Sequence, residues 1–261
     1  MTLLLRFTLT VLLCAAPCVY GQLPVPTPPT ATIPGSSPPI VTESLSVFER
    51  PNGVLMRPAA LTYLMSLTKS SGQTIPLGTR TVTVSDAALG GAAGWLIAEA
   101  RRGTAVESTD SVYLARADLA PERWSATIGR AQLGASFTRD SAFGAVESYQ
   151  GRSSFAMAVP PGALLSAGMV ERLVELLPLR VGYRASAWLM LVDGTSPRAL
   201  PAEIAVDRED RATVSGRTVD CWLVSIRAGM IEQRLWVSKS ESRVVRVEQA
   251  LPDGVLSSVL Q

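Results

Sequence analysis

The clearest spacing of catalytic residue types is Ser66 followed by Lys69, an S-x-x-K pattern. In penicillin-interacting serine enzymes the lysine of this pattern helps to deprotonate the serine hydroxyl. The companion motifs are missing, because Ser85-Asp86 is followed by alanine instead of asparagine and no Lys-Thr-Gly occurs. The surrounding run 61–67 also predicts a strand, whereas that serine belongs at a helix start. A histidine-free serine hydrolase using Ser66 and Lys69 is therefore kept only as an outside alternative.

A group of carboxylates, Glu203, Asp207, Glu209 and Asp210, is the second candidate, since paired carboxyl groups can act as general acid and base. Arginines alternate with these carboxylates at positions 208 and 211. Mixed charge over so short a stretch is typical of a solvated surface. We therefore predict that 207–211 is the exposed tip of a hairpin, and that the chain is not an enzyme.

Metal and thiol chemistry find little support in the sequence. The chain has no histidine and three cysteines, two of which lie in the N-terminal leader described below. The remaining Cys221 precedes Trp222 and two aliphatic residues, which predicts a buried and inert thiol. Zinc sites depend on His and Cys, so we predict no metal site and no cofactor, with carboxylate-bound calcium left open. The run Gly90–Gly94 lacks the lysine of a phosphate-binding loop and predicts a turn.

The N-terminus has the pattern of a secretory signal peptide, which we assign to 1–21. Arg6 supplies a positive charge, Phe7–Ala16 is a short apolar run, and Val19-Tyr20-Gly21 suits cleavage after Gly21. Lipidation of Cys18 is the alternative, disfavoured because Pro17 precedes it where a small residue is usual. The sequence therefore predicts a periplasmic or secreted protein with no integral membrane span after leader cleavage.

Composition divides the rest of the chain into two parts. Residues 22–41 are rich in Pro, Thr and Ser, which predicts an extended linker that buries nothing. Residues 42–261 are long enough for one β-rich domain, and 47% hydrophobic residues supply a core. The net charge of +2 is spread along the chain, which argues against nucleic-acid binding.

Short runs of alternating apolar and polar residues predict antiparallel strands. They occur at 61–67, 79–84 and 95–100, through 106–159, and throughout 181–260. The dipeptides Asn52-Gly53, Asp193-Gly194 and Asp253-Gly254 are typical of tight hairpin turns, since both positions tolerate positive φ. The fold class predicted is mainly β, with a curved antiparallel sheet or half-barrel.

One segment, Ala163 to Leu177, breaks the period of two. Leu165, Met169 and Leu173 recur every four positions, while Glu171, Arg172 and Glu175 lie on the other side and Pro178 ends the pattern. The spacing predicts one amphipathic helix, whose apolar stripe would pack on the concave face of the sheet.

Three tryptophans, Trp188, Trp222 and Trp236, fall on separate predicted strands. If all three point inward, they line either a core or an apolar pocket together with the helix. Alternation places Trp222 inward, on the side of Val224 and Ile226. The candidate ligand-binding residues are therefore Leu165, Met169, Leu173, Trp188, Trp222 and Trp236.

The strands after the helix carry a family resemblance. The runs are 181–184, 204–206, 216–224, 235–239 and 243–248, with a turn glycine and two tryptophan-bearing strands. In this order they resemble the bacterial envelope family catalogued as domain of unknown function 3108, over residues 177–260. The resemblance implies an exported, β-rich protein without an assigned activity. Its curved sheet is also similar in outline to carriers of lipoproteins across the periplasm, a likeness of fold alone.

Two function classes follow. In the first, a non-enzymatic envelope protein binds or carries an apolar or amphiphilic ligand, such as a lipid, between helix and sheet. In the alternative, a structural or interaction module of the envelope, with another envelope protein as partner, fills its core with its own side chains. An enclosed apolar cavity with an open mouth would favour the first, and a tightly packed core the second.

Overall fold

A computed structural model describes residues 46–103, 107–160, 162–193 and 196–261. The predicted leader and linker, with Cys14 and Cys18, lie outside these residues, as does Gly194 of one predicted turn. Almost every described segment is a strand of one sheet. The strands are β1 (Ser46–Val47), β2 (Ala59–Lys69), β3 (Thr74–Leu89), β4 (Ala92–Arg102), β5 (Ser108–Ala115), β6 (Pro121–Ile128), β7 (Ala131–Phe137), β8 (Ser141–Ser148), β9 (Gly151–Ala158), β10 (Ala163–Leu164), β11 (Arg184–Asp193), β12 (Ser196–Val214), β13 (Arg217–Ala228), β14 (Ile231–Ser238), β15 (Val244–Leu251) and β16 (Gly254–Leu260).

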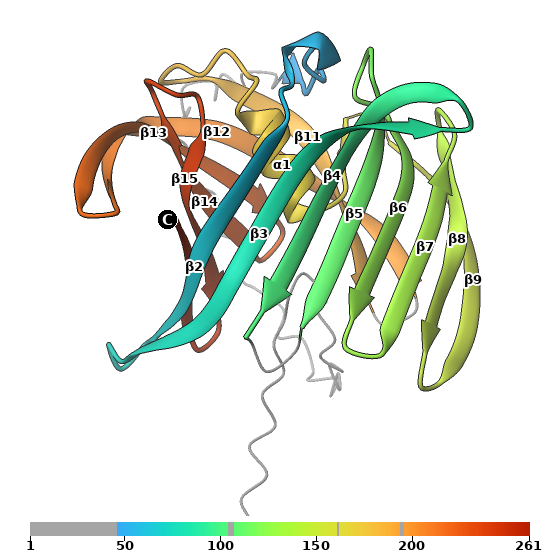
Figure 1. Ribbon diagram of the computed structural model, residues 1–261, viewed down its shortest axis with the longest axis horizontal. Helices are drawn as coiled ribbons and strands as arrows, with labels where there is room; N and C mark the ends of the chain where they lie inside the picture. Colours follow the sequence, from blue (N-terminus) through green and yellow to red (C-terminus); the bar gives the residue numbers. More distant parts are fainter. Residues whose placement is uncertain (1–45, 104–106, 161, 194–195) are drawn as a thin grey trace, which may run out of the picture.

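The sheet runs in the order β1-β11-β12-β13-β14-β15-β16-β2-β3-β4-β5-β6-β7-β8-β9, with β10 beside β11. Two antiparallel meanders therefore join where β16 pairs with β2, with Leu260 opposite Tyr63 and Gly254 opposite Lys69. The sheet curls so that β2–β9 form one wall and β12–β15 the other (Figure 1). The predicted curved antiparallel sheet is confirmed.

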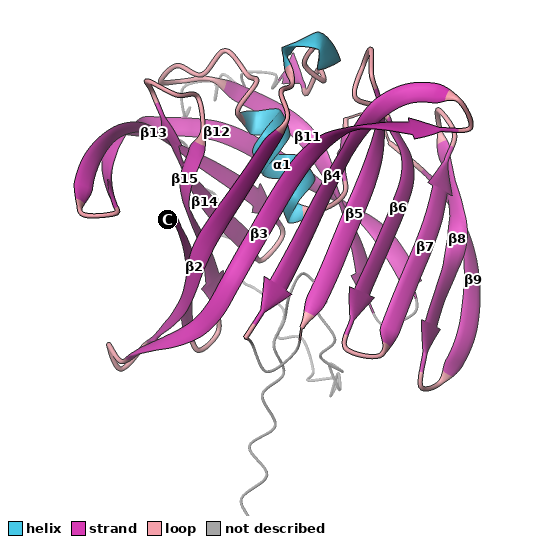
Figure 2. Ribbon diagram, in the orientation of Figure 1, coloured by secondary structure: helices cyan, strands magenta, loops and turns pink. Residues whose placement is uncertain are grey.

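Helix α1 (Ala167–Val174) lies between the two walls (Figure 2). It is shorter than the predicted 163–177, because Ala163 and Leu164 form β10 and pair in parallel with β11. The Ser166 hydroxyl caps the helix by accepting the Met169 N–H at 3.2 Å. The helix ends at Val174 and is followed by two tighter turns, in which the Leu176 and Leu177 N–H groups donate to the Leu173 and Val174 carbonyls. Among the described residues, no helix has the length and apolar character needed to cross a membrane.

Two predicted turns have other structures. Asn52-Gly53 does not form a hairpin turn, because the Asn52 side chain accepts the Val54 N–H and caps a single 3-10 turn, η1 (Gly53–Leu55). Residues 207–211 are not a hairpin tip either. They lie within β12, where a bulge between Val206 and Arg208 bends the strand. Asp253-Gly254 does connect β15 to β16, as predicted.

The β12–β13 hairpin carries a second apolar cluster on the outer face of the sheet. The cluster consists of Ala212, Cys221, Leu223, Trp236 and Val245. Beyond the bulge, β12 also contacts β14 and β15, so the hairpin folds back over them. This arrangement buries Trp236 to 7% exposure and Cys221 completely, which confirms the predicted burial of the thiol. Burial raises the pKa of Cys221 to about 11.

Trp236 should therefore matter for stability through this outer cluster. We expect Trp236→Ala to lower the free energy of unfolding by about 3–5 kcal/mol, because a large buried ring leaves a cavity. Chemical denaturation measures the change. Met230→Ala, at a hairpin tip where the side chain is 99% exposed, is the control and should stay within about 0.5 kcal/mol. A Trp236→Ala protein as stable as this control would show that the cluster is dispensable.

Candidate functional site

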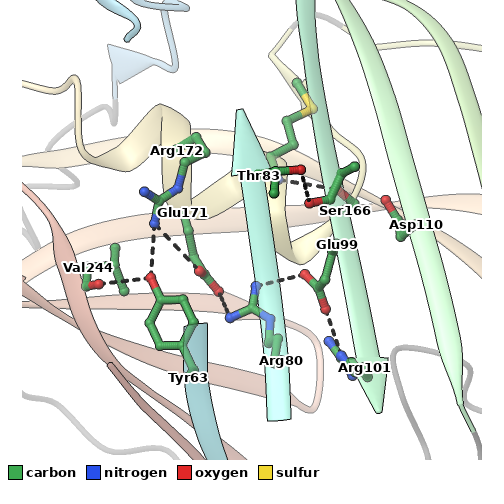
Figure 3. A network of polar contacts seen from close by, with 12 residues as sticks. Tyr63, Arg80, Thr83, Glu99, Arg101, Asp110, Ser166, Glu171, Arg172 and Val244 are labelled. Carbon is green, nitrogen blue, oxygen red and sulfur yellow. Dashed lines mark hydrogen bonds and ion pairs between the residues drawn. The ribbon is translucent and has the colours of Figure 1, made fainter. Parts of the chain in front are cut away.

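A buried network of charged side chains connects α1 to the wall formed by β2–β9. At its centre is Arg80 of β3, only 2% exposed and on the same inward face as Val82 and Val84. Its guanidinium contacts Glu99 of β4 at 2.7 Å and Glu171 of α1 at 2.8 Å. Figure 3 shows Arg80 lying between these two carboxylates. One arginine therefore links two strands to the helix.

The network continues on both sides of Arg80. On the strand side, the Arg101 Nε donates to Glu99 at 2.6 Å. On the helix side, Arg172 contacts Glu175 at 2.7 Å and donates to the Tyr63 hydroxyl at 3.2 Å. Tyr63 in turn donates to the Val244 carbonyl at 3.0 Å, and Glu175 accepts the Val244 N–H at 2.6 Å. The helix is thereby attached to both walls of the sheet.

The charges in this network are mutually stabilised. Burial alone would raise the pKa of Glu99, but Arg101 and Arg80 outweigh it and hold the pKa at about 2. Burial lowers the pKa of Arg80, and Glu171 and Glu99 more than reverse this, so Arg80 stays ionised. Burial raises the pKa of Glu175 to about 7, although Arg172 opposes the change. The sequence predicted that the charged residues of the helix lie on the side opposite the apolar stripe. That side is not exposed to solvent, since Glu171 is 0% exposed.

A cavity of about 100 Å³ lies beside this network, between the inner face of β4–β8 and the segment that contains β10 and the start of α1. Its floor follows one row of cross-strand neighbours, Glu99, Asp110, Ala126, Leu133 and Val146. The row changes from charged to apolar along its length. Leu165, Trp124 and Met190 add apolar walls, and the partly exposed Ser108, Ile128 and Ala131 lie at the strand ends.

Asp110 is the unusual member of this row. Its Oδ2 accepts the Trp124 indole N–H at 3.0 Å, but its Oδ1 is shielded from solvent and has no hydrogen-bond partner. Burial raises the pKa of Asp110 to about 7 and Glu99 adds to this, while the Trp124 hydrogen bond and the nearby Ser166 hydroxyl offset only a part. Buried polar atoms are normally paired, so an unpaired carboxylate oxygen beside a cavity makes Asp110 a candidate site residue.

Other hollows in the described residues suit an apolar ligand less well. One of about 240 Å³ lies on the outer face of β3–β6 and is lined mainly by Thr, Ser and Ala side chains. Another of about 260 Å³, near the end of α1, is lined by Arg57, Arg172, Glu175, Glu241 and Arg243 among others. The cavity at Asp110 combines an apolar lining with one charged end, which is the usual composition of a small-molecule site.

The structure brings the six sequence-predicted ligand residues only partly together. Leu165 lines the cavity, whereas Met169 and Leu173 are fully buried in the main core. Trp188 and Trp222 pack against the same core and are partly exposed, with the Lys239 Nζ 4.1 Å from the Trp222 ring centre. Trp236 lies on the opposite face, in the outer cluster. Strand alternation explains the difference, because Trp236 faces Leu223 across β13 and β14.

The two catalytic alternatives do not form sites. Ser66 and Lys69 both lie in β2, where residues three apart point to opposite faces of the sheet. Among the carboxylates, Glu203 pairs with Arg184 at 2.6 Å and Asp207 with Arg227 at 3.4 Å, in pairs open to solvent. These contacts are typical of surface ion pairs.

Sequence reasoning missed Arg80, Glu99 and Asp110. Each has the inward parity of its own strand, Arg80 with Val82, Glu99 with Ile97, and Asp110 with Val112. A charged residue in an apolar register is a detectable signal, because an unpaired buried charge is costly. The strand pattern alone could not predict the partners of these residues, because Glu171, which pairs with Arg80, belongs to the helix.

One comparison with a solved structure supports the fold. A β-barrel-like protein of domain of unknown function DUF1849 from Brucella abortus is similar, with a TM-score of 0.50 at 8% identity, over 82% of this chain and 98% of that chain. The hypothetical lipoprotein YmcC from Escherichia coli (K12) aligns with a TM-score of 0.31 at 12% identity, over 78% of this chain and 87% of that chain. No protein-family model and no curated protein matches the chain. The resemblance to domain of unknown function 3108 therefore stays a prediction.

Removing Arg80 should destabilise the protein severely. Arg80→Met would leave Glu99 and Glu171 buried without their shared cation, and we expect a loss of about 3–5 kcal/mol in the free energy of unfolding. The matched control is Arg211→Met, which breaks an exposed pair with Asp220 and should cost less than about 1 kcal/mol. Equal losses in the two variants, measured by denaturant unfolding, would contradict a central role for Arg80.

Neutralising the two neighbouring carboxyl groups should have opposite effects. Asp110→Asn removes a poorly paired buried charge and should stabilise the protein at pH 8 by on the order of 1–3 kcal/mol. Glu99→Gln removes the partner of two arginines and should cost about 3–5 kcal/mol. Thermal and chemical unfolding of both variants test the opposite signs.

The same carboxyl group predicts a pH dependence. In the folded protein, Asp110 takes up its proton near pH 7, well above the ordinary range near pH 4, so stability should rise as the pH falls from about 7 toward about 4. Asp110→Asn should reduce this rise and keep the part due to Glu175, whose pKa is also about 7. A flat profile in the unaltered protein, or an unchanged one in Asp110→Asn, would contradict the assignment.

Proposed function

We propose that this protein is a non-enzymatic, exported envelope protein that binds the apolar part of an amphiphile between the curved sheet and the segment β10–α1. The observation that carries the proposal is the cavity of about 100 Å³ beside Asp110. A core filled by its own side chains would leave no such space, so the cavity favours ligand binding over the structural alternative.

The size of the cavity limits what can enter it. Buried apolar cavities of about 150 Å³ hold benzene, and sites for drug-sized ligands measure about 300–1,000 Å³. The space at Asp110 therefore suits the end of an acyl chain or a similarly slim group. The rest of a longer ligand would leave past Ser108, Ile128 and Ala131, which are the partly exposed lining residues.

The geometry of the charged end favours binding over catalysis. Glu99 and Asp110 are neighbouring carboxyl groups with different pKa values, a pattern that can mark an acid and a base. Both Glu99 oxygens, however, are engaged by arginines, Oε2 by Arg80 and Oε1 by Arg101. Glu99 thus has no free oxygen to activate a water molecule or a substrate.

Export and the envelope location rest on the sequence. The signal peptide predicted at 1–21 would deliver the domain to the periplasm or beyond, where amphiphiles need a shielded environment in water. The β-barrel-like neighbour shares the fold, and fold alone does not assign a ligand.

Filling the cavity should abolish binding. Ala126 lies in the floor of the cavity, so Ala126→Leu would occupy the space of the ligand. Thr127→Leu is the matched control, since the next residue on β6 faces the outer side of the sheet. We expect an apolar fluorescent probe, N-phenyl-1-naphthylamine, to bind the unaltered protein and Thr127→Leu, and to lose at least about tenfold in affinity for Ala126→Leu.

Native mass spectrometry of protein purified from its own envelope gives a second measurement. A bound amphiphile should leave with the unaltered protein and be absent from Ala126→Leu. If no small molecule is recovered and the probe does not bind, the protein is not a carrier and the structural alternative holds.

A further inference from the structure

We propose that the cavity selects a ligand whose head group donates hydrogen bonds to Asp110 and carries positive charge, as a primary alkylammonium does. This inference rests on the proposed function and adds the chemical class of the head group. It follows from two observations at the charged end of the cavity: a buried acceptor with no partner, and two carboxyl groups beside a single arginine.

The unpaired acceptor is the Oδ1 of Asp110. The oxygen is shielded from solvent and has no hydrogen-bond partner, while the Oδ2 is held by the Trp124 indole N–H at 3.0 Å. An unsatisfied buried acceptor costs about 1–3 kcal/mol. A ligand that donates a hydrogen bond at this position would recover that cost, and one that only accepts would not.

The neighbouring arginines are committed elsewhere. Arg80 divides its guanidinium between Glu99 and Glu171, and the Arg101 Nε donates to Glu99. The Ser166 hydroxyl, which caps α1, accepts the Met169 N–H, and its own O–H lies close enough to Asp110 to lower the pKa of that carboxyl group. Figure 3 shows Asp110 beyond Glu99, outside the chain of dashed contacts that ends at Arg101. An ionised carboxylate can accept about four hydrogen bonds, so Asp110 has room for a ligand donor at Oδ1 beside Trp124 and Ser166.

The charges around the cavity favour a cation over an anion. The charged residues that line the cavity are Glu99, Asp110 and Arg101, which are two carboxyl groups against one guanidinium. From β6, β7 and β8, the lining residues bring no charged group, only Gln132 as a polar one. A carboxylate head would therefore face Glu99 and Asp110 across a short distance in a medium of low dielectric constant.

The pH dependence of binding has a defined sign. Burial raises the pKa of Asp110 to about 7, and the ammonium group binds best to the ionised carboxylate. The affinity for an alkylammonium should therefore rise as the pH increases through about 7. A neutral alcohol of the same length should bind with little dependence on pH, because a hydroxyl can donate to or accept from either form of Asp110.

The test compares ligands with the same chain and different heads: hexylamine, hexanol and hexanoate. Isothermal titration calorimetry or displacement of the naphthylamine probe at pH 8 should give hexylamine at least about a tenfold advantage over hexanoate. Asp110→Asn should reduce this preference to within about twofold and remove the pH dependence for hexylamine. Because this substitution should stabilise the fold, loss of selectivity would not be a sign of unfolding.

Glu147→Gln is the matched control. It removes the same charge from β8, at an exposed position next to Val146 but on the other face of the sheet, and should keep the preference of the unaltered protein. Equal affinity for hexylamine and hexanoate would overturn the inference and leave the proposed function standing. So would a preference that survives in Asp110→Asn. Failure of all three ligands and of the probe would overturn both.

Discussion

The arrangement of the whole domain depends on the ion pairs that the buried Arg80 forms with two carboxylates. A guanidinium at 2% exposure is tolerable only if its charge is balanced within hydrogen-bond distance, and Glu99 and Glu171 provide this from a strand and from the helix. The apolar stripe of α1 would be satisfied by many positions on a concave sheet. The ion pairs define one position, because opposite charges in a medium of low dielectric constant cannot shift by a few ångströms without a large energetic cost.

The position of the helix in turn creates the cavity. Helix α1 begins after Ser166, once Ala163 and Leu164 have paired with β11, and it packs on β3 and β4. Strands β6–β8 face inward with Trp124, Leu133 and Val146, and the space above them is only partly filled by Leu165 and Met190.

Most of the features that the sequence predicted correctly came from the alternation of apolar and polar residues along the strands. It correctly placed strands at 61–67, 79–84 and 95–100 and set Trp222 inward, because a half-buried strand has a simple period of two. It failed for 207–211, where mixed charge suggested a turn and the strand continues through a bulge. Asp110 was missed for a different reason: a single charge within an apolar register signals function only once its partners, or their absence, are known. That information lies in the packing of α1 against β4 and β5.

The pairing of β16 with β2 has a consequence for how the chain folds. The strand nearest the C-terminus lies in the middle of the sheet, bonded to a strand from the other end of the described chain, with Leu260 opposite Tyr63. Contacts so distant in sequence close a long loop and are associated with slow folding. Each meander can pair its own strands earlier, but the edges of β2 and β15 stay open until the last strand arrives. The last strand therefore joins the two meanders into one sheet. Until it pairs, the open strand edges are vulnerable to aggregation.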